Sequence, residues 1–176
     1  MEELEIEIKA YCQNISDIKI KLAELDAVFI KTETESDQYF NHPAKDFAET
    51  DEALRLRNAA DTTILTYKGP KISKATKARI EKEVIVQDDK ETGEILNLLG
   101  FRQSGMVLKN RDYYELGDII ICLDDVKNLG SFVELEKKGS NLEVIEKELF
   151  SLAEKLGLEK FERKSYLEML LRVKSG

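Results

Sequence analysis

The sequence is poor in the residues on which several classes of protein depend. It has a single histidine and two cysteines, Cys12 and Cys122, which stand far apart and outside any CxxC pair. Neither a zinc site nor a disulfide framework is therefore expected, and both thiols are predicted to be reduced and packed. No apolar run approaches the roughly 20 residues of a bilayer span. The first residues are acidic where a signal peptide would be basic. We expect a cytoplasmic protein that binds no membrane.

An excess of positive charge and a glycine-rich loop are also missing. The formal net charge is -8 at pH 7, which argues against nucleic acid as a partner because a phosphate backbone requires a basic surface. The stretch KGPKISKA at 68–75 has one glycine and no Walker pattern, so no P-loop is predicted. At 176 residues, the chain is long enough for one substantial domain and short for two, and we predict a single domain over residues 1–176.

What the sequence does contain is repeated alternation of apolar and charged residues. The opening run, LEIEIK at 4–9, alternates one for one, which is typical of a strand with one face against a core. Turn residues such as Gly69 and Pro70 separate further runs of this kind. Eight strands are predicted, over residues 4–9, 34–40, 52–58, 62–69, 78–87, 105–116, 118–126 and 131–138.

Four segments between and after these strands have helical spacing. The first is expected to begin with Ser16 as its cap and to carry Ile18, Leu22, Leu25 and Phe29 on one face. A short helix is predicted over KETGEILNLL, residues 90–99, ending at Gly100. Two later helices are each predicted to start at a capping box, which pairs Ser140 with Glu143 and Ser165 with Glu168. The fold class is therefore α+β.

The charged faces of the predicted strands are unusual when they are taken together. For any one strand the simpler explanation is that this face meets water. Here, however, the faces use charges in pairs or triplets and include four arginines, and acids and bases balance at seven each. The acids are Glu5, Glu7, Glu81, Glu83, Asp124, Glu134 and Glu136, and the bases are Lys9, Arg55, Arg57, Lys68, Arg79, Lys109 and Arg111.

If the sheet closes on itself, these faces line a polar interior and the apolar faces point outward beneath the helices. Two carboxylates two residues apart on one strand lie about 7 Å from each other, which costs on the order of 2 kcal/mol at an effective dielectric near 20. A divalent cation removes that penalty, and carboxylate oxygens favour magnesium or manganese. Arginine and lysine are the usual partners of phosphate oxygens. The balance of acids and bases therefore indicates a metal-bound triphosphate as the ligand.

The first strand, Glu5-Ile6-Glu7-Ile8-Lys9, resembles the ExExK signature of the CYTH superfamily, the triphosphate tunnel metalloenzymes. DQYF at 37–40, the run HPAKDFAETDEALRLR at 42–57, LKNRDYY, CLDDVKNLGSFVELE and KSYLEML continue the resemblance over nearly the whole chain. In order and spacing these segments are similar to the class IV adenylyl cyclase branch. The resemblance implies an eight-stranded antiparallel closed tunnel barrel with a polar interior and helices packed on the outside.

The resemblance also implies roles for individual residues. Glu5, Glu7, Lys9 and Asp124 are the expected catalytic residues, and Mg²⁺ or Mn²⁺ is the expected cofactor. Metal ligation is expected from Glu5, Glu7, Glu134 and Glu136. Substrate binding is expected from Lys9, Arg55, Arg57, Lys68, Arg79, Lys109 and Arg111. The roles of Glu81 and Glu83 stay open.

Two reactions fit such a tunnel. The leading hypothesis is an adenylyl cyclase that converts ATP to cyclic AMP and pyrophosphate, and the alternative is a triphosphatase that hydrolyses tripolyphosphate, thiamine triphosphate or a nucleoside triphosphate. A third hypothesis, a non-catalytic polyphosphate or nucleotide sensor, would tolerate loss of the acids, all of which are present here. Neither the physiological substrate nor the oligomeric state follows from the sequence, and a homodimer is left open.

Overall fold

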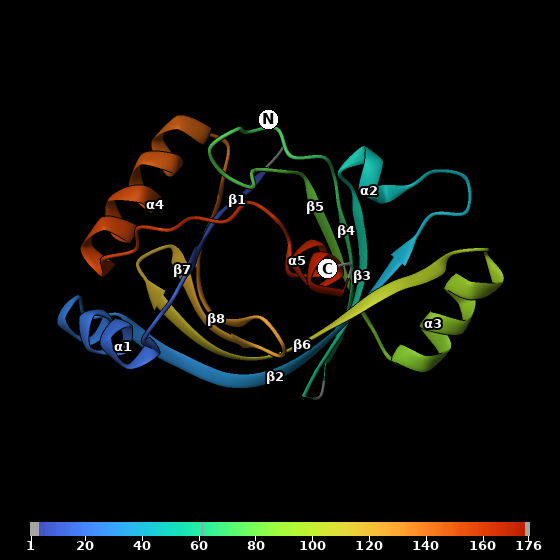
Figure 1. Ribbon diagram of the computed structural model, residues 1–176, viewed down its shortest axis with the longest axis horizontal. Coiled ribbons are helices and arrows are strands. Elements are labelled where there is room, and N and C mark those ends of the chain that lie inside the picture. Colours follow the sequence, from blue (N-terminus) through green and yellow to red (C-terminus); the bar gives the residue numbers. More distant parts are fainter. Residues whose placement is uncertain (1–3, 61, 175–176) are drawn as a thin grey trace.

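The computed structural model describes residues 4–60 and 62–174, and one curled antiparallel sheet dominates it (Figure 1). Its eight strands follow the order β1-β8-β7-β6-β2-β3-β4-β5. Their bounds are β1 Leu4–Tyr11, β2 Val28–Asn41, β3 Ala53–Ala59, β4 Thr62–Lys68, β5 Glu81–Val86, β6 Arg102–Leu116, β7 Ile119–Val126 and β8 Gly130–Gly139.

The two end strands of this sheet approach each other through the segment that precedes β5. Residues Glu5 and Arg79 form an antiparallel bridge, in which each backbone N–H donates to the other's carbonyl at 3.1 Å, and Lys77 N donates to the carbonyl of Glu7 at 2.9 Å. The predicted eight-stranded antiparallel barrel is thus confirmed. Its closure depends on residues 77–79 rather than on a ladder between β1 and β5.

Helices lie outside the sheet or over one of its ends. They are α1 Ile15–Glu24, α2 Phe47–Thr50, α3 Asp89–Leu98, α4 Leu142–Leu156 and α5 Tyr166–Lys174. No helix in the described ranges has the length and apolar character needed to cross a membrane.

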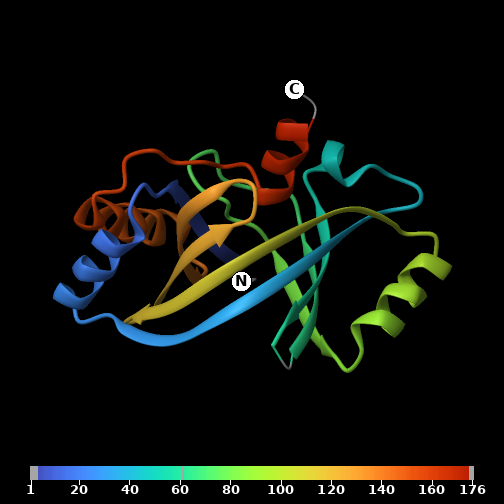
Figure 2. The same ribbon diagram turned by 60° about the horizontal axis from the view of Figure 1, so that its bottom comes forward.

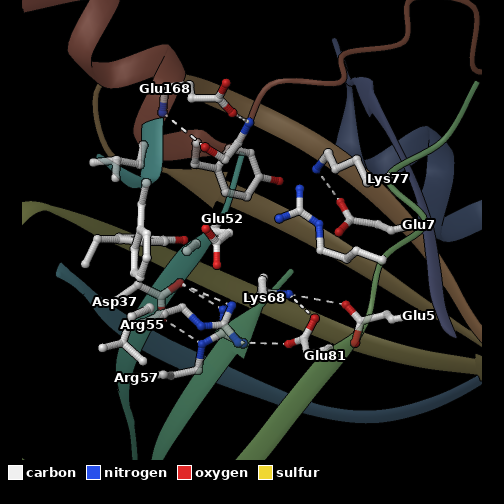
Figure 3. A pocket seen from close by; sticks show the side chains of 18 of the residues that line it. Glu5, Glu7, Asp37, Glu52, Arg55, Arg57, Lys68, Lys77, Glu81 and Glu168 are labelled. Atoms are coloured by element: carbon white, nitrogen blue, oxygen red, sulfur yellow. Dashed lines mark hydrogen bonds and ion pairs between the residues drawn. The ribbon is translucent and has the colours of Figure 1, made fainter. Parts of the chain in front are cut away.

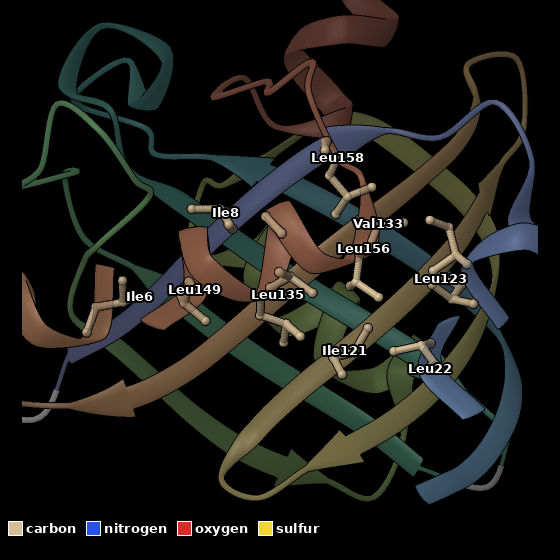
Figure 4. Packing of buried hydrophobic residues seen from close by; sticks show 14 of the residues in the cluster. Ile6, Ile8, Leu22, Ile121, Leu123, Val133, Leu135, Leu149, Leu156 and Leu158 are labelled. Atoms are coloured by element: carbon tan, nitrogen blue, oxygen red, sulfur yellow. The ribbon is translucent and has the colours of Figure 1, made fainter. Parts of the chain in front are cut away.

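The largest apolar core lies on the outer face of β1, β7 and β8, beneath α1 and α4 (Figure 4). Ile6 and Leu135 from the strands and Leu22, Leu149 and Leu156 from the helices are all fully buried there. Burying each such side chain contributes about 1.5 to 3 kcal/mol. The apolar faces of these strands therefore point away from the interior of the barrel, as predicted. On β5 the apolar residues are poorly covered, since Val84 is 55% and Ile85 73% exposed.

Helix α5 covers one end of the barrel (Figures 1 and 2). Its residues Tyr166 and Leu170 pack with Val107 and Phe132, which point from β6 and β8 to the inside of the sheet. The helix approaches β6 closely at Gly105, where a Cβ atom would collide with the side chain of Leu167. Its start confirms the predicted capping box, since Ser165 N donates to Glu168 Oε2 at 2.6 Å and Glu168 N donates to Ser165 Oγ at 3.2 Å.

The first helix is shorter than predicted, and the prediction that Phe29 lies on its apolar face is wrong. The helix ends at Glu24, and the positive φ of Asp26, 58°, turns the chain out of the helix. The β-branched run that follows favours a strand, so Phe29 belongs to β2, where it is 52% exposed and packs edge-on against Tyr114. Asn14 rather than Ser16 is the cap, because its side chain accepts from Ser16 N at 3.0 Å.

The other predicted capping box, Ser140 with Glu143, is placed one residue too early. Asn141 is the N-cap of α4, and its side chain accepts a hydrogen bond from Val144 N at 3.3 Å. The helix itself runs as expected and ends at Gly157, whose φ of +75° suits a glycine. Both thiols are free, with Cys122 buried and Cys12 partly buried.

Candidate active site

The curled sheet encloses a cavity of about 490 Å³ whose walls are mostly charged (Figure 3). Alternate residues of each strand point into it, because side chains along a strand alternate between its two faces. Of the residues predicted for the site, Asp124 alone does not line the cavity and lies fully buried behind Arg111. The others line it: Glu5, Glu7, Lys9, Arg55, Arg57, Lys68, Arg79, Lys109, Arg111, Glu134 and Glu136, together with Glu81 and Glu83.

One wall of the cavity is formed by β1 and β8 and is rich in acids. The register places Glu7 directly opposite Glu136 and Lys9 opposite Glu134. Burial, and then the charges of Glu5 and Glu7, raise the pKa of Glu136 to about 7. Among the described residues, no hydrogen bond or ion pair compensates the Glu136 side chain. This wall thus carries more negative charge than its own lysines neutralise.

The other acids of this wall have close basic partners: Lys68 holds Glu5, Lys77 holds Glu7 and Arg111 holds Glu134. Lys68 Nζ lies 3.3 Å from Glu5 Oε1 and also contacts Glu81. Burial opposes ionisation of Glu5, but the charge of Lys68, the hydrogen bonds with Glu81 and Lys68 and the charge of Arg55 together outweigh burial and lower the pKa of Glu5 to about 2. For Glu81 burial prevails over Lys68, and with the neighbouring Glu5 it raises the pKa to about 8. The two neighbours are thus shifted in opposite directions, with the ionised form favoured at Glu5 and the protonated form at Glu81.

The opposite wall, from β2, β3 and β6, holds paired charges in a dry environment. Arg57 donates two hydrogen bonds to Asp37, at 2.7 and 2.8 Å, and lies 3.0 Å from Glu35 Oε2. Lys109 Nζ lies 2.8 Å from Glu35 and 3.4 Å from Asp37. Burial would raise the pKa of Asp37, but the charges of Lys109 and Arg57 hold it well below its usual value. Two predicted phosphate-binding residues are thus tied to acids of β2.

Two other bases predicted to bind substrate have weaker contacts with acids. Arg79 is 8% exposed, and its guanidinium forms no hydrogen bond or ion pair with the part of the chain that the structure describes. Arg55 has only long contacts to acids, of which the shortest is 3.5 Å to Glu83, and its buried Nε has no partner. These two arginines are the ones most available to an anion in the cavity.

At the end of the cavity near α5, Tyr166 of this helix contacts charged residues of the site. Lys9 Nζ donates to the carbonyl of Lys164 at 2.5 Å and lies 4.0 Å from the centre of the Tyr166 ring. Burial, followed by the charge of Lys77, lowers the pKa of Lys9 to about 7. Tyr166 Oη donates to Asp124 Oδ2 at 2.6 Å, and Arg111 donates to both oxygens of Asp124 at 2.6 and 2.5 Å.

Replacing Tyr166 with phenylalanine should lower the free energy of unfolding by about 1.5 to 3 kcal/mol, because Asp124 is charged, fully buried and loses one of its donors. Thermal or denaturant unfolding measures this. Tyr11→Phe is the matched control, since the Tyr11 hydroxyl donates to Glu162 at 3.0 Å in an exposed position, and its loss should cost much less. Equal effects of the two variants would contradict a structural role for the Asp124 bond.

Two residues of the site were not found from the sequence. Glu35, which holds Arg57 and Lys109, lies in β2, where polar residues on both faces leave no alternation of charged and apolar residues to mark the inner one. Lys77 lies in the segment before β5, among three other lysines of the KGPKISKATK stretch. Its Nζ lies 2.5 Å from Glu7 Oε1 and 3.6 Å from Glu134 Oε1. Nothing in the local pattern distinguishes this lysine from its neighbours.

The carboxylates of β1 and β8 are suitable ligands for a divalent cation, but their oxygens do not converge on one position. Their oxygens are the ligands that magnesium and manganese prefer, and the uncompensated charge at Glu136 favours a cation there. Among the described residues, no three acidic, histidine or cysteine side chains stand close enough together to hold a metal as they lie. Glu5 and Glu7 are drawn to Lys68 and Lys77, while Glu134 is 2.5 Å from Arg111.

Comparison with known proteins agrees with the resemblance seen in the sequence. The model of the CYTH domain matches residues 3–166. A protein of Methanocaldococcus jannaschii that is provisionally named an adenylate cyclase is 39% identical over 171 residues, which cover 94% of this chain and 98% of the relative.

Solved structures share the fold. The PH1819 protein of Pyrococcus horikoshii OT3 superposes with a TM-score of 0.88 at 38% identity, over 96% of this chain and 99% of the other. A Hippeastrum protein, described as an adenylyl cyclase homologue with a dominant triphosphatase activity, superposes with a TM-score of 0.69 at 18% identity, over 97% of this chain and 96% of the other. At that identity the second likeness concerns the fold alone.

Proposed function

The chain belongs to the CYTH domain family, and from this premise we propose that it is a metal-dependent enzyme acting on a triphosphate. The observation that carries the proposal is the enclosed cavity in which a wall of carboxylates faces lysines and arginines. An extended polyanion with a bound divalent cation is complementary to both walls. We propose ATP as the substrate and cyclic AMP with pyrophosphate as the products.

The residues of the chain have distinct parts in this proposal. Arg79 and Arg55, which are least committed to internal ion pairs, bind the phosphate chain together with Lys68 and Lys9. Arg57, Lys109 and Arg111 are held by buried acids, which fix the orientation of these donors along the tunnel. The proposed metal ligands are Glu5, Glu7, Glu134 and Glu136. When bound, Mg²⁺ or Mn²⁺ would neutralise phosphate charge and lower the pKa of the attacking hydroxyl.

In the cyclase reaction the ribose 3'-hydroxyl loses its proton to water, and its oxygen forms a bond to the α-phosphorus while the bond from that phosphorus to the bridging oxygen of pyrophosphate breaks. The bases of the tunnel stabilise the charge that develops on the departing pyrophosphate, because they are already oriented and shielded from water. Asp124 keeps Arg111 in place rather than touching the cavity itself. We therefore assign Asp124 a positioning role in place of the catalytic role that the resemblance implies.

A triphosphatase is the alternative, and the Hippeastrum protein of the same fold gives a reason to keep it. In that reaction a water oxygen attacks the terminal phosphorus, and Glu5 or Glu7 orients the water and accepts its proton. The same tunnel serves either reaction, since the outcome depends on which phosphorus lies beside the acidic wall.

Product analysis separates the two reactions. The protein is incubated with ATP and Mn²⁺, and separately with tripolyphosphate and Mg²⁺. Formation of cyclic AMP with an equal amount of pyrophosphate is expected. Release of orthophosphate from both substrates without cyclic AMP would establish the triphosphatase instead. If no product forms from either, and EDTA and added metal make no difference, the proposal of a metal-dependent enzyme is wrong.

A further inference from the structure

Lys77 lies beside two of the proposed metal ligands. Its Nζ is 2.5 Å from Glu7 and 3.6 Å from Glu134, which come from different strands, and its side chain is 9% exposed. Figure 3 shows Lys77 and Glu7 pointing toward each other at one side of the cavity. A lysine ammonium is a compact point charge, so it neutralises these two carboxylates without bringing them together around a shared centre.

The backbone around Lys77 is held firmly, so this placement is not that of a loose surface side chain. Lys77 N donates to the carbonyl of Glu7 at 2.9 Å. The hydroxyls of Ser73 and Thr76 donate to Glu146 of α4 at 2.5 and 2.8 Å. Arg163 also donates to the carbonyl of Ser73, at 2.6 Å. These contacts fix the backbone position of Lys77 beside the acidic wall, while its four-carbon side chain can still change rotamer.

Glu5 and Glu134 of this wall are also held by bases, but each of those bases has a further acidic partner that is not a proposed metal ligand. Lys68, which holds Glu5, lies on β4 and also contacts Glu81. Arg111, which holds Glu134, lies on β6 and donates from Nε and Nη2 to Asp124. Both acid contacts of Lys77 are to proposed metal ligands, and Lys77 is the partner of Glu7 among the described residues. Displacing it would free Glu7 and remove one of the bases beside Glu134, which keeps Arg111, and it would leave no other acid without a partner.

We propose that Lys77 is a built-in counter-ion of the metal site. It holds Glu7 and Glu134 apart while no divalent ion is bound, and it gives up these carboxylates when an ion binds. Its ammonium then turns to the phosphates that the ion brings with it. The inference rests on the proposed function, because it takes Glu7 and Glu134 as metal ligands. It adds that metal and lysine compete for the same carboxylates.

Calorimetric titration with Mn²⁺ alone tests the competition without reference to activity. Lys77→Gln should bind Mn²⁺ more tightly than the wild-type protein, on the order of tenfold, because a positive charge has been removed beside the ion. Lys77→Arg keeps the charge and should show no gain. Lys137→Gln is the matched control, since Lys137 Nζ is 2.5 Å from Glu148 and 2.8 Å from Asp118 on the outer surface, and it should bind Mn²⁺ as the wild type does.

A second measurement avoids the need for the glutamine variant to fold. In the wild-type protein, Lys77 should react faster with an amine-specific reagent when Mn²⁺ is saturating, and mass spectrometry compares its labelling with that of Lys137. Unchanged labelling of Lys77, or Mn²⁺ affinity in Lys77→Gln that is equal to or below wild type, would overturn the inference while leaving the metal site intact. If the wild type binds no Mn²⁺ with or without tripolyphosphate, the proposed metal-dependent function fails, and the inference fails with it.

Discussion

Replacing Glu7 with glutamine is expected to lower metal-dependent turnover by roughly 100-fold or more, because a proposed ligand loses its charge at the centre of the acidic wall. The amide has nearly the same size, and Lys77 keeps Glu134 as a second partner at 3.6 Å. The fold should therefore survive, with unfolding at nearly the wild-type temperature. Initial rates at several Mn²⁺ concentrations measure the loss, which added metal should reverse only in part.

Glu148→Gln provides the matched control for this variant. Glu148 accepts from Lys137 at 2.5 Å, the same distance that joins Glu7 to Lys77, but it lies on the exposed side of α4. Removing its charge should leave turnover unchanged. Full activity of Glu7→Gln would take Glu7 out of the site, and it would also remove the basis for counting Glu134, its neighbour across Lys77, as a ligand.

Much of the fold could be predicted because the chain alternates so regularly. In β1, Leu4, Ile6, Ile8 and Ala10 all fall on one face, and a helical pattern of the right length is present to cover that face. The capping box of Ser165 and Glu168 was correct because both of its hydrogen bonds are local to four residues. Local patterns of this kind depend little on the rest of the molecule.

The errors arose where a local pattern competed with a turn or with distant contacts. Phe29 continues the helical spacing of α1, but Asp26 ends that helix in a left-handed conformation that the spacing does not reveal. Lys77 becomes part of the site only because residues 77–79 bridge to β1. Such a contact between segments 70 residues apart leaves no periodic signal in the sequence. The residue types of the site were therefore predictable, whereas their partners were not.

The pairing of Arg57 shows why partners matter for the expected effect of a mutation. From the sequence, Arg57 is simply a phosphate-binding residue. In the structure it donates two hydrogen bonds to Asp37, which is 1% exposed, and lies 3.0 Å from Glu35, which is fully buried. Removing Arg57 would leave two buried carboxylates with Lys109 as their closest remaining cation, and stranding buried charge in this way costs more than the pair itself contributes.

Arg57→Ala is therefore expected to lower the free energy of unfolding by about 3 to 5 kcal/mol, which denaturant titration would measure. Arg79→Ala is the matched control, because Arg79 lines the same cavity without an ion pair to the described chain. Its loss should change stability by about 1 kcal/mol or less while clearly weakening binding of tripolyphosphate. Adding Asp37→Asn to Arg57→Ala should recover part of the stability, since the stranded charge is gone. If Arg57→Ala and Arg79→Ala are equally stable, or if the second change recovers nothing, then Asp37 does not depend on Arg57, and Arg57 is as free as Arg79 to bind the substrate.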